Sequence, residues 1–368
     1  MPNVANEDGP AAGRRNSFDA LRIAAALCVF FGHQCELAGR PELTLGPLGI
    51  TLSNIGLFVF FAVSGYLVAQ SLAREPRPAN FLAARVLRIY PGAAANALFC
   101  VALGGAVTTL PPGAYWFDGR TWAYLIHGAA ILLPPTRLEL PGVFADARWA
   151  SVDTPIWTLK YELLCYLGLL ALGTFSSLLG IRPKRPLIAG AVILLLGYLW
   201  RISAGPAPDA EVFYADVNGF NLLRFGMIFC AGALYAAVED DLSRLRLALV
   251  TAALVALAPT PEATRAGLLL LAVPLSIEIG RSPLLFSRRY RAFGDLSYGL
   301  YLYSYPMQVL AVTRLPRGFG FWAETFAALS AAGVLAALSW TFVERPALRL
   351  KFRALAHDSP GLEAESSA

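Results

Sequence analysis

Four ionisable residues interrupt the first long apolar segment of the sequence, residues 18–37. They are Asp19, Arg22, His33 and Glu36, and an α-helix with about 100° between successive residues places all four on one face. A charge inside a membrane costs roughly 2.5–3.5 kcal/mol on insertion scales, so it is kept where it is paired or functional. Asp19, Arg22 and Glu36 therefore have two interpretations: a functional face, or an interfacial Asp19–Arg22 ion pair with a solvated Glu36 at the other end.

His33 lies deepest among these four residues. At a rise of about 1.5 Å per residue it is about 22 Å from Phe18, beyond the midplane of a hydrocarbon core about 30 Å thick. An imidazole can take up and return a proton near neutral pH, which makes His33 the candidate general base. The structural alternative is a hydrogen bond between helices. His127 and His357 lie in an outer loop and in the C-terminal tail, and we do not expect them in the site.

Arg85 and Arg88 form a second group, in the stretch "FLAARVLRIYPG". Three residues apart, they project from one side of a helical turn just before an expected span. Two guanidinium groups so placed can bind phosphate oxygens. The alternative is anchoring at the cytoplasmic membrane surface, where basic residues gather.

The composition predicts the elements that hold these residues. With 57% hydrophobic and 15% charged residues over 368 positions, the chain is too apolar for a soluble domain and is predicted to be an all-α, polytopic integral membrane protein. We expect ten spans, at 18–37, 50–72, 91–110, 156–180, 187–203, 219–238, 245–258, 265–280, 296–313 and 320–343. The net charge of +5 indicates membrane anchoring and no nucleic-acid partner, and the five cysteines indicate no disulfide framework.

Basic residues predict the orientation, because Lys and Arg concentrate in short cytoplasmic loops. Clusters at 74–88, 182–185, 281–291 and 345–353 place both termini in the cytoplasm. The expected location is the inner (cytoplasmic) membrane. Residues 1–16 and 351–368 are expected to be cytoplasmic tails, the second disordered, around a membrane domain at 17–350. The longest connection contains "TWAYLIHGAAILLPP", which is too short to cross and is expected to be re-entrant.

Six motifs in order carry a resemblance to a known family. They are "SFDALRIAAALCVFFGH", "FFAVSGYL", "RVLRIYP", "WTLKYE", "DLSYGLYLYSYP" and "FVERPALR", and together they resemble the acyltransferase-3 membrane family over residues 17–350. This family comprises O-acetyltransferases of bacterial surface and secreted glycans. The resemblance implies a membrane O-acyltransferase that moves an acyl group, usually acetyl from acetyl-CoA, to a glycan hydroxyl.

The resemblance also assigns roles to residues of this chain. His33 matches the family's essential histidine, and Arg85 and Arg88 match the arginines associated with the acyl donor. The remaining matches are Asp19 and Arg22 in the first motif, Ser64 and Gly65 as the small pair of the second, and Trp157 and Glu162 in the fourth.

One position departs from the common pattern of the family. Many members carry a histidine two residues before the proline of the ninth span, where this chain has Ser304 before Pro306. This excludes a mechanism with two intramembrane histidines, and we expect Ser304 to hydrogen-bond a neighbouring helix. The esterase-like domain that follows the membrane part in many relatives is not expected here.

These inferences combine into one expected mechanism. Acyl-CoA docks from the cytoplasm with its phosphates on Arg85 and Arg88, and its thioester reaches His33, which acts as general base or transient acyl carrier. Glu162, preferred by the family match, or Glu36 orients the imidazole. Ser64 either donates a hydrogen bond to the thioester oxygen or, with Gly65, permits close helix packing.

The expected partners are the acyl-CoA donor, a glycan or lipid-linked sugar acceptor, membrane lipids and a separate protein that completes transfer outside the cell. No metal and no tightly bound cofactor are expected. Two other functions stay open at this point: a transporter or flippase of lipid-linked sugars, and an inactive scaffold in a glycan-assembly complex.

Overall fold

The computed structural model describes residues 16–46, 49–145, 150–203, 216–238, 241–258, 260–283, 285, 295–316 and 319–350. Almost all of the expected tail at 1–16, the whole tail at 351–368 and most of the basic cluster at 281–291 lie outside the described residues. The cytoplasmic placement of the termini therefore stays a prediction.

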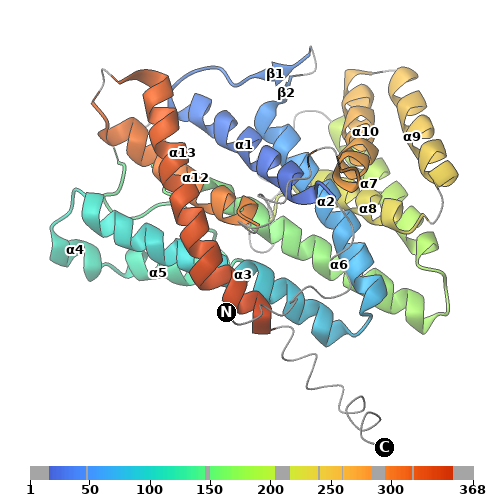
Figure 1. Ribbon diagram of the computed structural model, residues 1–368, viewed down its shortest axis with the longest axis horizontal. Coiled ribbons are helices and arrows are strands. Elements are labelled where there is room, and N and C mark those ends of the chain that lie inside the picture. The colour runs from blue at the N-terminus through green and yellow to red at the C-terminus, as the bar shows by residue number, and fades with distance from the viewer. Residues whose placement is uncertain are drawn as a thin grey trace, which may run out of the picture.

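The described chain is built almost wholly from helices that pack side by side (Figure 1). They are α1 (Phe18–Leu37), α2 (Leu52–Arg74), α3 (Pro78–Val107), α4 (Pro112–Trp116), α5 (Gly119–Ala129), the 3-10 helix η1 (Thr154–Thr158), α6 (Leu159–Leu178), α7 (Lys184–Ser203), α8 (Gly219–Ala236), α9 (Asp241–Ala256), α10 (Pro261–Arg281), α12 (Ser297–Arg314), α13 (Gly320–Ser339) and the π-helix η3 (Trp340–Glu344). Two short antiparallel strands, β1 (Thr44–Leu45) and β2 (Ile50–Thr51), connect α1 to α2. The expected all-α class is confirmed.

Eight of these helical stretches are long and apolar enough to cross a membrane. They are Phe18–Leu37, Leu52–Arg74, Pro78–Val107, Thr154–Leu178, Lys184–Ser203, Gly219–Ala236, Ala263–Arg281 and Gly320–Leu350. Each corresponds to one of the ten predicted spans, so the chain is a multi-pass membrane protein. The other two predicted spans correspond to α9 and α12, and the number ten stays a prediction.

α12 owes its more polar sequence to its place inside the bundle. It packs against α1, α3 and α13, and its Tyr301, Tyr303, Tyr305, Ser304 and Gln308 are buried. The side-chain amide of Gln308 donates to the Phe30 carbonyl of α1 over 2.7 Å. A helix enclosed by other helices can carry polar side chains because those helices satisfy their hydrogen bonds.

The third helix begins earlier than the sequence predicts. The third span is expected to start at residue 91, but α3 begins at Pro78 and passes through Pro91. Arg85 and Arg88 consequently lie within a long helix, where the sequence placed them just before a span. The expected helical turn is thus part of α3, which holds the two side chains against α2 and α12.

The long connection after α3 contains the amphipathic helix α5. Asp118 caps it by accepting a hydrogen bond from the Arg120 amide over 2.8 Å. Thr121 and Tyr124 are buried on the side that packs against α3, whereas Trp122 and Ile126 are exposed. At 11 residues α5 is too short to cross a membrane, and its depth in the membrane stays a prediction.

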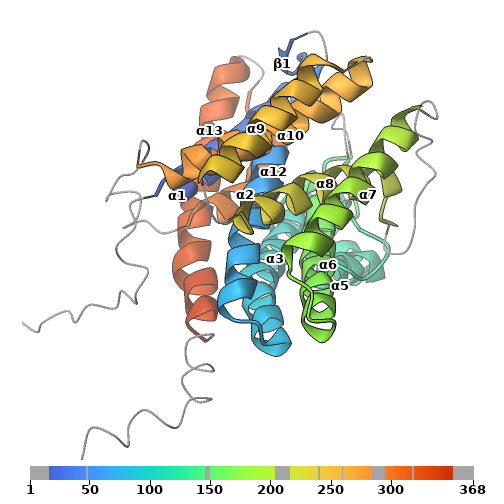
Figure 2. The ribbon, with the colours of Figure 1, turned by 90° about the vertical axis from the view of Figure 1, so that its right-hand side faces the viewer.

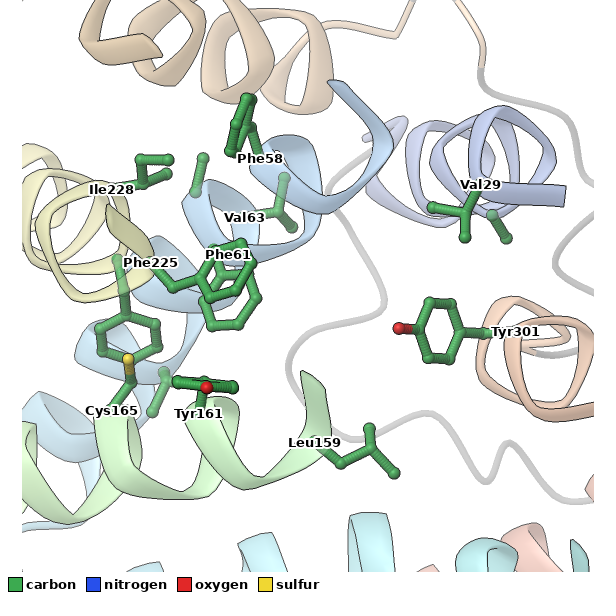
Figure 3. Close-up of a cluster of buried hydrophobic side chains, with 14 of the residues drawn as sticks. Val29, Phe58, Phe61, Val63, Leu159, Tyr161, Cys165, Phe225, Ile228 and Tyr301 are labelled. Atoms are coloured by element: carbon green, nitrogen blue, oxygen red, sulfur yellow. The ribbon is translucent and has the colours of Figure 1, made fainter. Parts of the chain in front are cut away.

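α2 occupies the middle of the bundle and contacts α1, α6, α8 and α10 (Figures 1 and 2). Close approach to α8 depends on Gly65, where any Cβ atom would collide with the Phe229 carbonyl. The contact is filled by aromatic rings: Phe61 stacks on Phe225 with centroids 4.4 Å apart, beside Tyr161 of α6 (Figure 3). This close packing fixes the α2 face that carries Ser64.

Candidate functional site

A cavity of about 230 Å³ is lined by five residues that the sequence singled out. Its polar lining includes Arg22 of α1, Ser64 of α2, Arg85 and Arg88 of α3, and Glu162 of α6. These positions are far apart in the sequence, so only the packing of four helices brings them together. Apolar residues such as Phe60, Phe61 and Leu57 line much of the rest.

Two carboxylates hold Arg88 at the cavity wall. Its Nη2 lies 2.5 Å from Asp295 Oδ2 and its Nη1 lies 3.8 Å from Glu344 Oε2. Asp295 Oδ2 also lies 2.9 Å from Arg22 Nη1, and Arg22 is paired with Asp19 over 2.6 Å. Burial alone would raise the pKa of Asp295, but Arg22 and Arg88 hold it well below its usual range. The network therefore ties α1, α3, α12 and η3 together.

Arg85 has a different environment, one helical turn earlier. Its Nη2 donates to Ser71 Oγ over 3.1 Å, and its guanidinium lies over the rings of Phe81 and Tyr166 at 5.5 and 5.6 Å. Within the described ranges Arg85 has no carboxylate partner, and its Nε is buried without a hydrogen bond. Its guanidinium thus lines the cavity without an ion pair in the described chain, as suits a group that binds anions.

Glu162 and Ser64 form a hydrogen-bonded group on the cavity wall. Ser64 Oγ donates to Glu162 Oε1 over 3.1 Å, and the hydroxyl of Tyr166 donates to the same oxygen. Ser64 therefore hydrogen-bonds to a carboxylate. It also adjoins the close α2–α8 contact at Gly65.

His33 lies outside this cavity, further along α1. Its ring meets that of Tyr305 edge-on with centroids 5.3 Å apart, and its Nδ1 lies 3.6 Å from Glu36 Oε2. Of the two carboxylates predicted to orient the imidazole, the structure places Glu36 beside it and commits Glu162 to Ser64 and Tyr166. His33 Nε2 makes no hydrogen bond within the described part of the chain.

Two tyrosines of α12 link the cavity to His33. Tyr301 lines the cavity and shares a 2.6 Å hydrogen bond with the Thr158 hydroxyl. Tyr305 follows four residues later and contacts the His33 ring. Residues four apart lie on one helix face, about 6 Å along the axis. One face of α12 therefore runs from the cavity wall at Tyr301 to the His33 ring.

Two further predicted residues, Trp157 and Ser304, pack within the helix bundle and do not line the cavity. Trp157 contacts the rings of Tyr161 and Phe225, with centroids 5.5 and 6.0 Å away. Ser304 is buried, but its hydroxyl donates to the Leu300 carbonyl of its own helix. The expected bond from Ser304 to a neighbouring helix is therefore wrong, because the carbonyl four residues earlier is within reach of a helical serine.

Sequence reasoning missed Asp295, Glu344, Tyr301 and Tyr305, although all four lie in quoted motifs. The available signal was charge balance: arginines in apolar helices require counterions, and Asp295 and Glu344 flank the last two spans. Glu344 also ends a π-helix, an element frequent at functional sites. Among the described residues no group of His, Cys, Asp and Glu could hold a metal ion.

Comparisons with known proteins identify the family of the chain. The acyltransferase domain family matches residues 15–343. The chain is 26% identical to an O-acetyl transferase of Shigella phage Sf6, over 90% of this chain and 96% of that protein. It is 28% identical to nodulation protein 10 of Rhizobium leguminosarum bv. viciae, over 93% and 95% of the two chains. It is 25% identical to the exopolysaccharide production protein ExoZ of Rhizobium meliloti, over 86% and 94%. No solved structure matches significantly.

The family match covers most of the chain, including the arginine cavity and the helix that carries His33. Together with the apolar helices, the family match identifies the class of enzyme. The chain belongs to the acyltransferase-3 family and is a membrane-embedded O-acyltransferase.

Proposed function

We propose that the protein transfers acetyl from acetyl-CoA to a hydroxyl of a surface or secreted glycan, from the inner membrane. The observation that carries the proposal is Arg85, a cavity guanidinium with no carboxylate partner among the described residues. An acyl-CoA supplies the missing anion through its phosphates, and Arg22 and Arg88 add positive charge at the same end. The relatives named for O-acetyl transfer and exopolysaccharide production support the reaction and the acceptor class.

The cavity gives the donor a direction. Its charged end holds the phosphates, and its apolar wall of Phe60, Phe61 and Leu57 suits the uncharged pantetheine arm. The arm points along α12 toward Tyr301, one helical turn from Tyr305 and the His33 ring. Bringing the thioester to His33 requires the arm to pass the Tyr301–Thr158 hydrogen bond.

His33 then serves as the general base. Its Nε2 takes the proton from the sugar hydroxyl as that oxygen attacks the thioester carbonyl, and the C–S bond breaks to release the CoA thiolate. The imidazolium returns the proton to the thiolate, so that atoms and charges balance. Glu36, 3.6 Å from Nδ1, stabilises the imidazolium while it carries the charge. Should His33 carry the acyl group itself, the same two nitrogens would serve a two-step transfer.

The function is tested by turnover of the purified protein in lipid nanodiscs. Radiolabelled acetyl-CoA is supplied with lipid-linked glycans extracted from cells that lack the gene, and released CoA and labelled glycan are both measured. We expect both products in equal amounts. The absence of CoA release would overturn the proposal. Transport of the unmodified glycolipid by the protein in sealed vesicles would then indicate a flippase, and the absence of transport would indicate a scaffold.

A further inference from the structure

A second tyrosine–hydroxyl group lies beside His33, one helical turn from the group that ends the donor cavity. At the cavity, Tyr301 bonds to Thr158. Four residues along on both elements, the Tyr305 hydroxyl lies near the hydroxyls of Thr154 and Ser151, and Thr154 donates to Ser151 over 2.8 Å. At two successive turns of α12, a tyrosine hydroxyl thus lies near a threonine hydroxyl of η1.

The two groups differ in exposure and in what they face. Thr158 and Tyr301 are buried and line the donor cavity. Ser151 and Thr154 are half-buried and do not line it. Tyr305, which lies near both of them, packs its ring edge-on against His33. The outer residues are therefore more exposed than the inner pair.

Ser151 and Thr154, the outer hydroxyl group, can form the hydrogen bonds that bind a sugar. Serine and threonine hydroxyls both donate and accept hydrogen bonds, as sugar hydroxyls do. The carboxylate of Glu36, half of it exposed, adds a strong acceptor on the same side of His33. Nε2 of His33 is left without a hydrogen bond in the described chain and can receive a proton from a hydroxyl held there.

We propose that Ser151 and Thr154 bind the acceptor sugar through its hydroxyls and that Tyr305 positions both of them against His33. This acceptor subsite rests on the proposed function and deepens it. It separates the two substrates: acyl-CoA occupies the arginine cavity on one side of the Tyr301–Thr158 bond, and the polyhydroxylated acceptor occupies the other. The thioester end of the donor is the part that must pass this bond to meet the acceptor.

The test compares two substitutions at one position. Thr154→Val keeps the shape and removes the hydroxyl, whereas Thr154→Ser keeps the hydroxyl. The probe is the glycolipid extract used above, titrated at saturating acetyl-CoA in nanodiscs. We expect Thr154→Val to raise the half-saturating extract concentration five- to tenfold, about the effect of one lost hydrogen bond, with the KM for acetyl-CoA unchanged. Thr154→Ser should stay within twofold of the wild type.

Two further variants make the test specific. Ser151→Ala, at a half-buried position, should act like Thr154→Val and covers the case in which that variant does not fold. Tyr303→Phe is the matched control, since Tyr303 lies on α12 but contacts Phe99 of α3 and Ser339 of α13. It should leave both half-saturation values unchanged.

Other outcomes overturn the assignment. If Thr154→Val and Ser151→Ala both match Tyr303→Phe, the hydroxyls only join η1 to α12. If they raise the KM for acetyl-CoA instead, the outer group belongs to the donor site. If the wild type releases no CoA, the proposed function has failed, and the subsite falls with it.

Discussion

Arg88 and Asp295 form a 2.5 Å ion pair between α3 and the start of α12, whereas Arg85, one turn away on the same helix, has no carboxylate partner in the described chain. The family resemblance treats the two arginines alike. Their surroundings differ, and so do the roles we assign to them. Arg88 links helices through its ion pairs and adds positive charge to the cavity, whereas Arg85 is available to bind the donor. The predictions for each residue differ accordingly.

Arg85→Lys should raise the KM for acetyl-CoA about tenfold with little change in kcat or abundance. Lysine keeps the charge but cannot offer the planar pair of donors that a phosphate accepts. Steady-state kinetics in nanodiscs measure this effect. Arg77→Lys is the control, because Arg77 is exposed and pairs with Glu75. An unchanged KM for acetyl-CoA in Arg85→Lys would indicate that Arg85 serves membrane anchoring instead of donor binding.

Asp295→Asn should lower the free energy of unfolding by about 2 kcal/mol. The substitution leaves Arg22 and Arg88 without their shared carboxylate. Breaking a fully buried pair costs about 3–5 kcal/mol, and the partial exposure of these side chains reduces that figure. Thermal unfolding in detergent measures the loss, and Asp118→Asn, at an exposed pair with Arg120, is the control. Equal melting temperatures for both variants would show that the ion pairs of Asp295 do not stabilise the fold.

The same carboxylate gives a prediction about pH. Although burial acts in the opposite direction, Arg22 and Arg88 lower the pKa of Asp295 in the folded protein. A group with a lowered folded pKa stabilises the protein above its unfolded pKa, about 3.9 for aspartate, and loses this effect as pH falls toward the folded value. The stability difference between wild type and Asp295→Asn should therefore be constant from pH 7 to 5 and narrow below about pH 4. A difference that narrows between pH 7 and 5 would contradict this.

Tags at either terminus should be cytoplasmic and a tag at Gly113 should be external, because the basic residues fall mostly on one side of the predicted spans. Gly113 lies in α4 with open space around it, so an inserted tag should be tolerated. Accessibility to a membrane-impermeant reagent in intact and lysed cells measures the sidedness. Termini on opposite faces would rule out an even number of spans.

Apolar length was enough to predict most of the fold. Eight of the ten expected spans coincide with long apolar helices, since hydrophobic length is local information. The start of α3 could not be predicted in this way, because Pro91 sits within a helix that neighbouring helices support. The sequence also could not show that α12 is enclosed by protein, since only packing distinguishes it from a less apolar span.

The site was predictable by residue type but not by pairing. Arg22, Ser64, Arg85, Arg88 and Glu162 were all singled out, and the structure brings them to one cavity. The sequence preferred Glu162 as the partner of His33, and the structure places Glu36 there instead. Glu36 lies three residues from His33 on one helix, so local spacing was a better guide than the family match. Tertiary pairs such as Arg88 with Asp295, 207 positions apart, leave no such local sign.

The last prediction concerns the chemistry on a single intramembrane histidine. His33→Gln preserves size and hydrogen bonding but cannot exchange a proton, so CoA release and glycan acylation should both fall by at least a hundredfold, in the range typical of a lost general base. Ser304→Ala should keep most of its activity, because that hydroxyl bonds only to the Leu300 carbonyl of its own helix. Turnover is compared at matched abundance in the membrane. An active His33→Gln beside an inactive Ser304→Ala would move the catalytic centre from α1 to α12, where Tyr301 and Tyr305 would then be the nearest candidates to bind the acyl group.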